Sequence, residues 1–311
     1  MSSIIEVNNL CKQFGDFKAV DNLSFTVEAG QVYGFLGQNG AGKSTTIRML
    51  LTLIKPTSGK IEIFGMSLEK HRKEVLRQTG AVIERPDLYK YLSALENLRI
   101  FAAMSGQKIS EKKLMEQLAM VGLAERAHSK VKTYSQGMKQ RLGIATALVH
   151  DPKLIILDEP TNGLDPQGIA DIRNLIIRLS KEMGKTLMIS SHLLSEMELI
   201  ADSMLIIDKG RKLVEGKVNE LFDPADTIVE LQTADDTASL EQLKQAGFDK
   251  LVKGRRNDCI LLQMHRKEIP GVMKQLMQLG LPVISFHSKH SLEDYFLSLT
   301  TGNPYVEAAA N

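Results

Sequence analysis

The amino-acid sequence predicts an α/β fold, in which helices cover a parallel sheet, followed by a smaller α+β domain. Short apolar segments of strand length alternate with amphipathic helical segments, which is the pattern of parallel sheets. One of these strands, Val32–Leu36, runs directly into a glycine-rich loop and a helix. After Phe222-Asp223-Pro224 the pattern changes to shorter alternating segments. We therefore expect domains at residues 1–222 and 223–311.

Strands of the first domain are indicated by short apolar runs bounded by turn-forming residues. They are expected at residues 4–10, 21–28, 32–36, 61–64, 81–83, 153–157 and 186–190, with a closing hairpin at 203–207 and 212–215. The helix after the glycine-rich loop is predicted from Lys43 to about Leu53, because Pro56 cannot continue it. Residues 86–150 are predicted to form a helical subdomain, since apolar residues recur there at three- and four-residue spacing. A further helix is expected over residues 169–183.

The second domain carries no recognisable chemical motif. Its strands are expected at residues 227–232, 260–265 and 282–287, and its helices at 238–246, 269–279 and 291–299. This order suggests a ferredoxin-like fold with one strand still to be placed. Phe286 and Tyr295 are predicted to be core residues and His287 to be exposed, because neighbours on a strand face opposite sides. Dimer contact and regulation both remain open as its role, and residues 301–311 are expected to fray.

The composition is that of a folded protein without a membrane span of its own. Hydrophobic residues make up 43% and charged residues 24% of the 311 residues, and a net charge of +2 does not favour nucleic acid as a partner. The two cysteines, Cys11 and Cys259, are far apart and indicate reduced thiols. No run approaches the roughly 18–20 apolar residues that cross a bilayer, and the N-terminus lacks signal-peptide features. We expect a cytoplasmic protein whose contact with the membrane comes through a partner.

The clearest motif is the glycine-rich loop, which reads Gly37-Gln38-Asn39-Gly40-Ala41-Gly42-Lys43-Ser44-Thr45. It follows a strand and opens a helix, as a phosphate-binding loop (P-loop) requires. Glycines let backbone N–H groups approach phosphates, and a helix N-terminus favours anions. We expect this loop to bind ATP, with Lys43 on the β- and γ-phosphates and the Ser44 hydroxyl on Mg²⁺.

Two carboxylates end a later apolar strand. Asp158 and Glu159 directly follow Leu154-Ile155-Ile156-Leu157. Burial of this strand would carry Asp158 to the edge of the phosphate site, where it can hold Mg²⁺. Glu159 would then be placed to orient or deprotonate the attacking water. An isolated acidic pair is usually only solvated, but together with the P-loop it favours ATP hydrolysis.

Three further motifs resemble those of the ABC ATPases. Their signature segment is matched by Tyr134-Ser135-Gln136-Gly137-Met138-Lys139-Gln140-Arg141, and their dimer-contact loop by Pro160-Thr161-Asn162-Gly163-Leu164-Asp165. Their switch histidine is matched by His192, which follows an apolar strand. The resemblance covers residues 4 to about 222. It implies a P-loop NTPase fold, with a RecA-like parallel core, an antiparallel β subdomain and an α-helical subdomain.

The resemblance also implies a head-to-tail pair of ATPase domains, as a homodimer or pseudo-dimer, with two ATP molecules between them. Ser135 and Gly137 of one domain would face the γ-phosphate held by Lys43 of the other, with Gln136 between them in the same nucleotide-contacting segment. A hydroxyl, a glycine N–H and a helix N-terminus all favour an anion. Asp165 would contact the partner domain.

In the same family, the switch histidine and an aromatic residue also touch the nucleotide. His192 would hydrogen-bond the γ-phosphate and complete a catalytic set with Glu159 and Lys43. Phe14 would stack on adenine, with Phe17 as a rival. Either phenylalanine could instead be a core residue.

The signature segment departs from the commonest form of the family. Tyr134, Gln136 and Met138 stand where leucine, glycine and glutamine are usual. Ser135 and Gly137 are kept, so we expect anion binding to be kept as well.

A second departure is Glu84, which stands where most family members have a glutamine that touches Mg²⁺ and the attacking water. A carboxylate is a stronger Mg²⁺ ligand and adds negative charge beside Asp158 and Glu159. Transporters of lantibiotics and bacitracin-like peptide antibiotics resemble this sequence at that position. The resemblance thus implies an ATPase subunit on the cytoplasmic face of the membrane. It would power a separate transmembrane permease that exports a peptide antibiotic, a bacteriocin or another amphipathic compound.

The segment after Glu84 is rich in large apolar residues. In the family this region receives a helix of the membrane subunit, and we expect Tyr89 and Tyr91 to form the contact surface, with about half of the apolar side chains in the core. Four basic residues are interpreted as a solvated rim and not as a nucleic-acid site: Lys130, Lys132, Lys139 and Arg141.

Other classes of function fit the sequence less well. A soluble ABC ATPase acting on ribosomes or DNA usually has two ATPase domains, long coiled coils or zinc insertions, whereas this chain has one P-loop and neither heptads nor cysteine clusters. A kinase-like P-loop enzyme would leave residues 135–141 and His192 unexplained. A pure binding module is disfavoured by Glu159.

Overall fold

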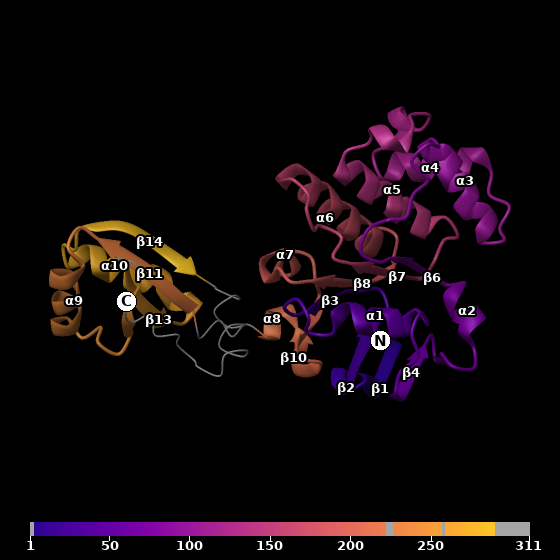
Figure 1. Cartoon of the computed structure of the whole chain (residues 1–311). Coiled ribbons are helices and arrows are strands. Elements are labelled where there is room, and N and C mark those ends of the chain that lie inside the picture. Colours follow the sequence, from indigo (N-terminus) through magenta and orange to yellow (C-terminus); the bar gives the residue numbers. More distant parts are fainter. Residues whose placement is uncertain (1–2, 222–226, 257–258, 290–311) are drawn as a thin grey trace. The chain divides into compact units, whose positions relative to one another are not determined.

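The computed structural model describes residues 3–221, 227–256 and 259–289 and divides into two compact units, Met1–Val218 and Asn219–Asn311 (Figure 1). The division falls close to the expected position. Each unit contains one cysteine, and both cysteines are partly exposed and outside any disulfide. Among the described residues, no helix is long and apolar enough to cross a membrane.

A six-stranded sheet forms the centre of the first unit. Its strands, in order across the sheet, are β10 (Arg211–Lys217), β9 (Ser203–Asp208), β3 (Val32–Leu36), β8 (Thr186–Ser191), β7 (Leu154–Asp158) and β6 (Thr79–Val82). All neighbours are parallel except β10, which closes the sheet antiparallel to β9. β3 and β7 are buried along their whole length, as their continuous apolar sequences predict. Their carboxyl ends therefore meet at one edge of the sheet.

A four-stranded antiparallel sheet accompanies this core, with the order β2 (Phe17–Glu28), β1 (Ser3–Phe14), β4 (Ser58–Ile63) and β5 (Met66–Ser67). The expected limits of β1 and β2 were wrong, because both strands continue to the turn at Gly15 and Asp16. Irregular pairing lets polar residues such as Lys12 and Gln13 join the ladder, which ends at the pair Phe14 and Phe17.

Seven α-helices occur in the described part of the first unit, and an eighth, α8, spans the boundary with the second unit. They are α1 (Lys43–Leu50), α2 (Arg72–Leu76), α3 (Ala94–Met104), α4 (Glu111–Met120), α5 (Gln136–Leu148), α6 (Pro166–Lys181), α7 (Leu194–Glu198) and α8 (Val218–Leu221). α1 is shorter than expected and gives way to Thr52, whose φ of 57° lies in the left-handed region. Figure 1 shows α3, α4 and α5 on one side of the six-stranded sheet and the antiparallel sheet on the other.

The first helix of the predicted helical subdomain, α3, begins at Ala94. Ser93 caps α3 in a reciprocal capping box with Glu96, so the preceding residues form a loop.

One hydrophobic core joins the two sheets through α1. It combines buried residues of β1 and β2 with Ile47 and Leu50 of α1 and with residues of β3, β7, β8 and β9. The P-loop helix is thereby fixed between the two sheets, which places its N-terminus at the edge where the parallel strands end.

The second unit follows the order β-α-β-β-α-β. Its elements are β11 (Thr227–Thr233), α9 (Asp236–Gln245), β12 (Val252–Arg256), β13 (Cys259–Met264), α10 (Ile269–Gln278) and β14 (Val283–Lys289). The strands form one antiparallel sheet in the order β12-β13-β11-β14, so β12 is the strand that the sequence left unplaced.

Two side chains of β14 have the environments that the sequence predicts. Phe286 packs against the core of the unit, and His287 is exposed. Tyr295, the predicted helix at 291–299 and the tail at 301–311 lie outside the described residues.

Candidate active site

The P-loop is held in place by close backbone packing. A Cβ atom at Gly37 would lie 2.6 Å from the carbonyl oxygen of Ile207, and one at Gly42 would lie 2.6 Å from that of Ala19. Gly42 also has a φ of 106°, and as the N-cap of α1 it offers no side chain to the first helical turn. The N–H groups of that turn thus keep their capacity to bind an anion.

Lys43 is directed into the site from the start of α1. Its side chain is only 6% exposed, and its Nζ donates a hydrogen bond to the carbonyl oxygen of Gly37 at 2.7 Å. The same Nζ lies 3.2 Å from Oε1 of Glu159. The buried ammonium group therefore joins the P-loop to the end of β7.

Glu159 connects three elements of the site. It follows β7 with a φ of 50°, a left-handed conformation that is unfavourable for a residue with a side chain. Its Oε2 lies 2.8 Å from Nδ1 of His192, which directly follows β8, while its Oε1 faces Lys43. Glu159, Lys43 and His192 are thus brought into one contact chain.

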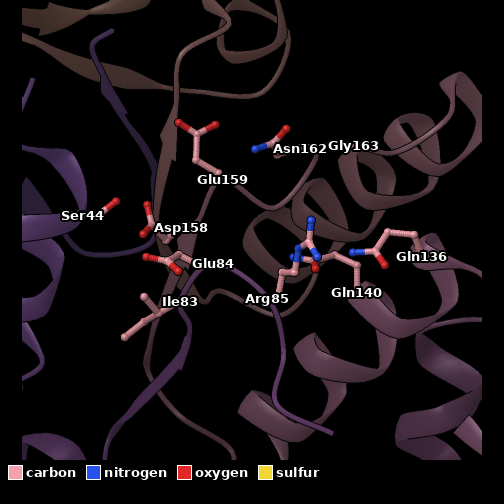
Figure 2. Close-up of a pocket in the computed structure, with 10 residues that line it drawn as sticks. All are labelled: Ser44, Ile83, Glu84, Arg85, Gln136, Gln140, Asp158, Glu159, Asn162 and Gly163. Carbon is pink, nitrogen blue, oxygen red and sulfur yellow. The ribbon is translucent and has the colours of Figure 1, made fainter. Parts of the chain in front are cut away.

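A cavity of ≈ 470 Å³ opens beside these residues. It is lined by Ser44, Ile83, Glu84, Arg85, Gln136, Gln140, Asp158, Glu159, Asn162 and Gly163. Figure 2 shows the acidic side chains and Ser44 on one side of it and the two glutamines of α5 on the other. Residues from the P-loop, the strand ends and the signature segment therefore share one space.

The donor set at the strand end fits a magnesium ion that arrives with phosphate. Oδ2 of Asp158 and Oε1 of Glu159 are buried without a hydrogen-bond partner among the described residues. Oε1 of Glu159 has the Lys43 ammonium at 3.2 Å, but the alignment is too poor for a hydrogen bond, so the contact is an ion pair. Within the described ranges, no group of three or more His, Cys, Asp or Glu side chains forms a ready-made metal site. Mg²⁺ is typically held by one or two carboxylates together with substrate phosphates.

Glu84 lines the same cavity from the loop after β6. Its φ is 55°, and its side chain, which is 62% exposed, is hydrogen-bonded to Arg48 of α1. An exposed ion pair of this kind contributes little to stability. The carboxylate predicted to bind metal is thus close to Ser44 and Asp158 but has a guanidinium partner.

The signature segment places its polar residues at the start of α5. Ser135 is the N-cap, and its Oγ accepts a hydrogen bond from the N–H of Met138 at 3.2 Å. Gln136 lines the cavity, and Gly137 is half-buried. Tyr134 is buried, and its hydroxyl donates to the carbonyl oxygen of Arg126 at 2.6 Å. Tyr134 therefore stabilises the signature segment through burial and through this hydrogen bond.

The loop from Pro160 to Asp165 leads into α6. Asp165 is the exposed N-cap of this helix, and its Oδ1 accepts a hydrogen bond from the N–H of Gly168 at 3.1 Å. Thr161 donates to Oε2 of Glu196 in α7 at 2.5 Å. This contact ties the loop to the helix that follows His192.

Comparison with known proteins identifies the family. The family model described as ABC transporter matches residues 20–162. The bacitracin transport ATP-binding protein BcrA of Bacillus licheniformis is 44% identical, over 97% of this chain and 99% of its own. The chain belongs to the ATP-binding subunits of ABC transporters. The lantibiotic transport ATP-binding protein SrtF of Streptococcus pyogenes is 42% identical, over 73% of this chain and 95% of its own.

A solved structure of an ABC ATPase also matches. The cassette MJ0796, in a dimeric post-hydrolysis state bound to ADP and Pi, is 26% identical over 69% of this chain and 99% of its own, with a TM-score of 0.62. The predicted P-loop NTPase fold is confirmed. This ABC subunit binds ATP, and its hydrolysis of ATP is coupled to transport. The alternative of action on ribosomes or DNA is not favoured.

In this ABC subunit the structure excludes one alternative, a core location of Phe14 or Phe17, and corrects one prediction, the solvated rim at Arg141. Phe14 and Phe17 are 50% and 65% exposed, so neither is a core residue. They are available for stacking because they stand at the tip of the β1–β2 hairpin, and the ammonium of Lys12 lies 4.8 Å from the Phe14 ring. Arg141 is not a solvated rim residue, since its guanidinium is half-buried and donates to the carbonyl oxygen of Val121.

Tyr89 and Tyr91 are exposed, whereas Leu88, Leu95 and Leu98 are buried. The segment after Glu84 is therefore divided between core and surface as expected, and Tyr89 and Tyr91 remain available to a partner.

Several residues of this ABC site are not indicated by the sequence motifs. Arg48, Arg85 and Ser190 carry no motif by themselves. Ser190 could have been found from the topology, because it ends the strand next to β7 and pairs in register with Asp158. Arg48 lies one helical turn beyond Ser44 on the face of α1 near the cavity, a position that periodicity alone indicates.

Proposed function

We propose that this chain hydrolyses ATP in the cavity beside the P-loop, with Glu159 activating the attacking water and Lys43 and His192 contacting the γ-phosphate. The contact chain from Lys43 through Glu159 to His192 carries the proposal. It joins a cation, a base and a hydrogen-bonding ring at the edge of the sheet where the P-loop also ends. Such positioned charges are what phosphoryl transfer needs.

Ser44 and Asp158 would hold Mg²⁺, with Glu84 as a third oxygen ligand once it leaves Arg48. The unpartnered Oδ2 of Asp158 supports this assignment. When bound, Mg²⁺ neutralises phosphate charge during transfer. The protein's own part is to fix the oxygen ligands around the phosphates.

A second copy of this ABC subunit, or a related one, would complete each ATP site. Ser135, Gln136 and Gly137 would contribute the start of α5, and the N–H groups of a helix N-terminus favour an anion. Asp165 would lie at the contact between the two copies, and Phe14 would stack on adenine. The dimeric state of the cassette MJ0796 supports this arrangement.

The transported compound is proposed to be a peptide antibiotic, a bacteriocin or another amphipathic compound, exported by a separate transmembrane permease. The printed names of relatives refer to transport of bacitracin and of a lantibiotic. Exposed Tyr89 and Tyr91 would contact the permease, and the subunit would then lie on the cytoplasmic face of the membrane.

The substrate class is tested in the native host by deleting the gene for this chain. The deletion strain is expected to be several-fold more sensitive to bacitracin or to a lantibiotic such as nisin, in a growth-inhibition assay. Wild-type protein should restore resistance, and Glu159→Gln, expressed to the same level, should not. Unchanged sensitivity to both antibiotics would refute the substrate class and leave the ATPase assignment intact.

A further inference from the structure

Ser190 lies where the two strands that carry the catalytic groups run side by side. It belongs to β8 and pairs in register with Asp158 of β7. Its relative exposure is 0%, so its hydroxyl must find partners within the protein. It finds one in each of the two acidic residues at the end of β7.

The hydroxyl group makes two hydrogen bonds of opposite sense. Its Oγ donates to Oδ1 of Asp158 at 2.5 Å and accepts from the N–H of Glu159 at 2.9 Å. An ionised carboxylate only accepts and a backbone N–H only donates, so a hydroxyl satisfies both at once in one orientation. A purely apolar side chain at this position satisfies neither.

The hydrogen bond to Asp158 determines which of its carboxylate oxygens is free toward the cavity. Oδ1 is taken up by Ser190, while Oδ2 is buried without a hydrogen-bond partner among the described residues, and Asp158 lines the cavity. Ser190 therefore determines which carboxylate oxygen is left for a ligand. Fixing the rotation of a metal-binding carboxylate in this way raises its affinity for the metal.

The second bond acts on the backbone of Glu159. This residue has a φ of 50°, and its N–H is held by Oγ of Ser190 and, more distantly at 3.3 Å, by the Ser190 carbonyl oxygen. The conformation directs the side chain to Lys43 and His192. Since a left-handed residue persists only where its surroundings hold it, the hydroxyl helps to keep the base in place.

We propose that Ser190 is a positioning residue for ATP hydrolysis, which sets the free oxygen of Asp158 and the backbone of Glu159 with one hydroxyl group. The inference deepens the proposed function and rests on its assignment of Asp158 to Mg²⁺. The adjacent Ser191 has a different role, since within the described part of the chain its Oγ forms hydrogen bonds only with the backbone of Leu193.

The test measures binding of the non-hydrolysable analogue AMP-PNP by titration calorimetry, with Mg²⁺ and with EDTA, beside steady-state ATPase rates. Ser190→Ala is expected to lower the gain in affinity given by Mg²⁺ about tenfold. Affinity in EDTA should change less than twofold, and kcat should fall at least tenfold. Ser190→Thr, which keeps the hydroxyl, should stay within threefold of wild type when its melting temperature is retained.

Ser180→Ala is the matched control, because it also removes a buried hydroxyl, one that donates to the carbonyl oxygen of Gly30. It should keep the Mg²⁺-dependent gain. Equal losses of affinity with Mg²⁺ and with EDTA in Ser190→Ala, or no loss, would overturn the inference.

The variant Asp158→Asn distinguishes the assignment of Asp158 to Mg²⁺ from the positioning role of Ser190. If Asp158→Asn keeps the Mg²⁺-dependent gain, the assignment of Asp158 itself fails. If Asp158→Asn loses the gain and Ser190→Ala keeps it, only the role of Ser190 is refuted.

Discussion

At the scale of single residues, the site depends on side chains that have more than one partner. Glu159 contacts Lys43 through one oxygen and His192 through the other, on a left-handed backbone. A neutral amide would keep the size of the side chain but lose its basicity and weaken both contacts.

We therefore expect Glu159→Gln to bind ATP with an affinity close to that of wild type and to lose about 10²- to 10⁴-fold in kcat, the usual contribution of a general base. Lys43→Ala should instead weaken nucleotide binding. Steady-state ATPase assays and fluorescent-nucleotide titrations separate the two effects. Vigorous hydrolysis by Glu159→Gln would exclude this residue as the base.

Glu84 offers a second residue-scale prediction. Glu84→Gln should raise the Mg²⁺ concentration needed for half-maximal ATPase activity several-fold, because an amide is a weaker ligand than a carboxylate. Its stability should change by less than about 1 kcal/mol, since the ion pair with Arg48 is exposed. Arg48→Gln breaks the same pair but keeps the carboxylate. Equal shifts in the two variants would attribute the effect to the ion pair and deny the carboxylate a special role.

The motif residues could be predicted from sequence because each motif combines unusual residues at fixed spacing. Their supporting partners, Ser190 and Arg48, are common residues that carry no motif, and they can be found only by adding strand register and helix periodicity to the motifs. The exposure of Phe14 and Phe17 could not be predicted either, because an aromatic residue beside a turn is compatible with both core and surface.

At the scale of elements, continuous apolar strands were the most predictable. The limits of β3 and of the strands β7 and β8 were found to within one residue, because buried parallel strands are continuous apolar runs. The polar ends of β1 and β2 were missed because backbone pairing extends them through irregular register. α2 and α7 have five residues each, too few for a helical period to be seen.

Two glycines of the P-loop, Gly40 and Gly42, differ in the space that is available for an added side chain. Gly42→Ala combines a φ of 106° with a Cβ position 2.6 Å from the Ala19 carbonyl oxygen, whereas Gly40 has a φ of 84° and open space. Gly40→Ala should cost about 1–2 kcal/mol, and Gly42→Ala at least about 1 kcal/mol more. Urea unfolding followed by circular dichroism measures both. Equal losses of unfolding free energy in the two variants would mean that the backbone at Ala19 moves aside without an energetic penalty.

A pH prediction concerns the junction of α5 with β6. Nε2 of His150 lies 3.1 Å from the carbonyl oxygen of Thr79, and burial lowers the pKa of this histidine below its ordinary 6.5. The unfolded chain then binds the proton more readily, so stability is full above pH 6.5 and falls as the pH drops toward the folded pKa. Melting temperatures between pH 7.5 and 5 should fall less steeply in His150→Gln. The same dependence of melting temperature on pH in wild type and in His150→Gln would contradict a contribution of His150.

At the scale of the whole molecule, the exposed ends of α5 and α6 matter because they would meet a second copy. Purified Glu159→Gln should shift from monomer to dimer when Mg-ATP is added, as measured by light scattering after size exclusion. Ser135→Arg in the same background places a cation and bulk at the contact and should prevent the shift. A shift that persists in that double variant would place the dimer contact elsewhere.

The division of the chain into two units has a practical consequence. Its only two cysteines, Cys11 and Cys259, lie in different units, and both are partly exposed. Nitroxide labels attached to them would give one spin pair per chain without any substitution. Pulsed dipolar spectroscopy with and without nucleotide would then report whether the small unit changes its distance from the ATPase core during the catalytic cycle.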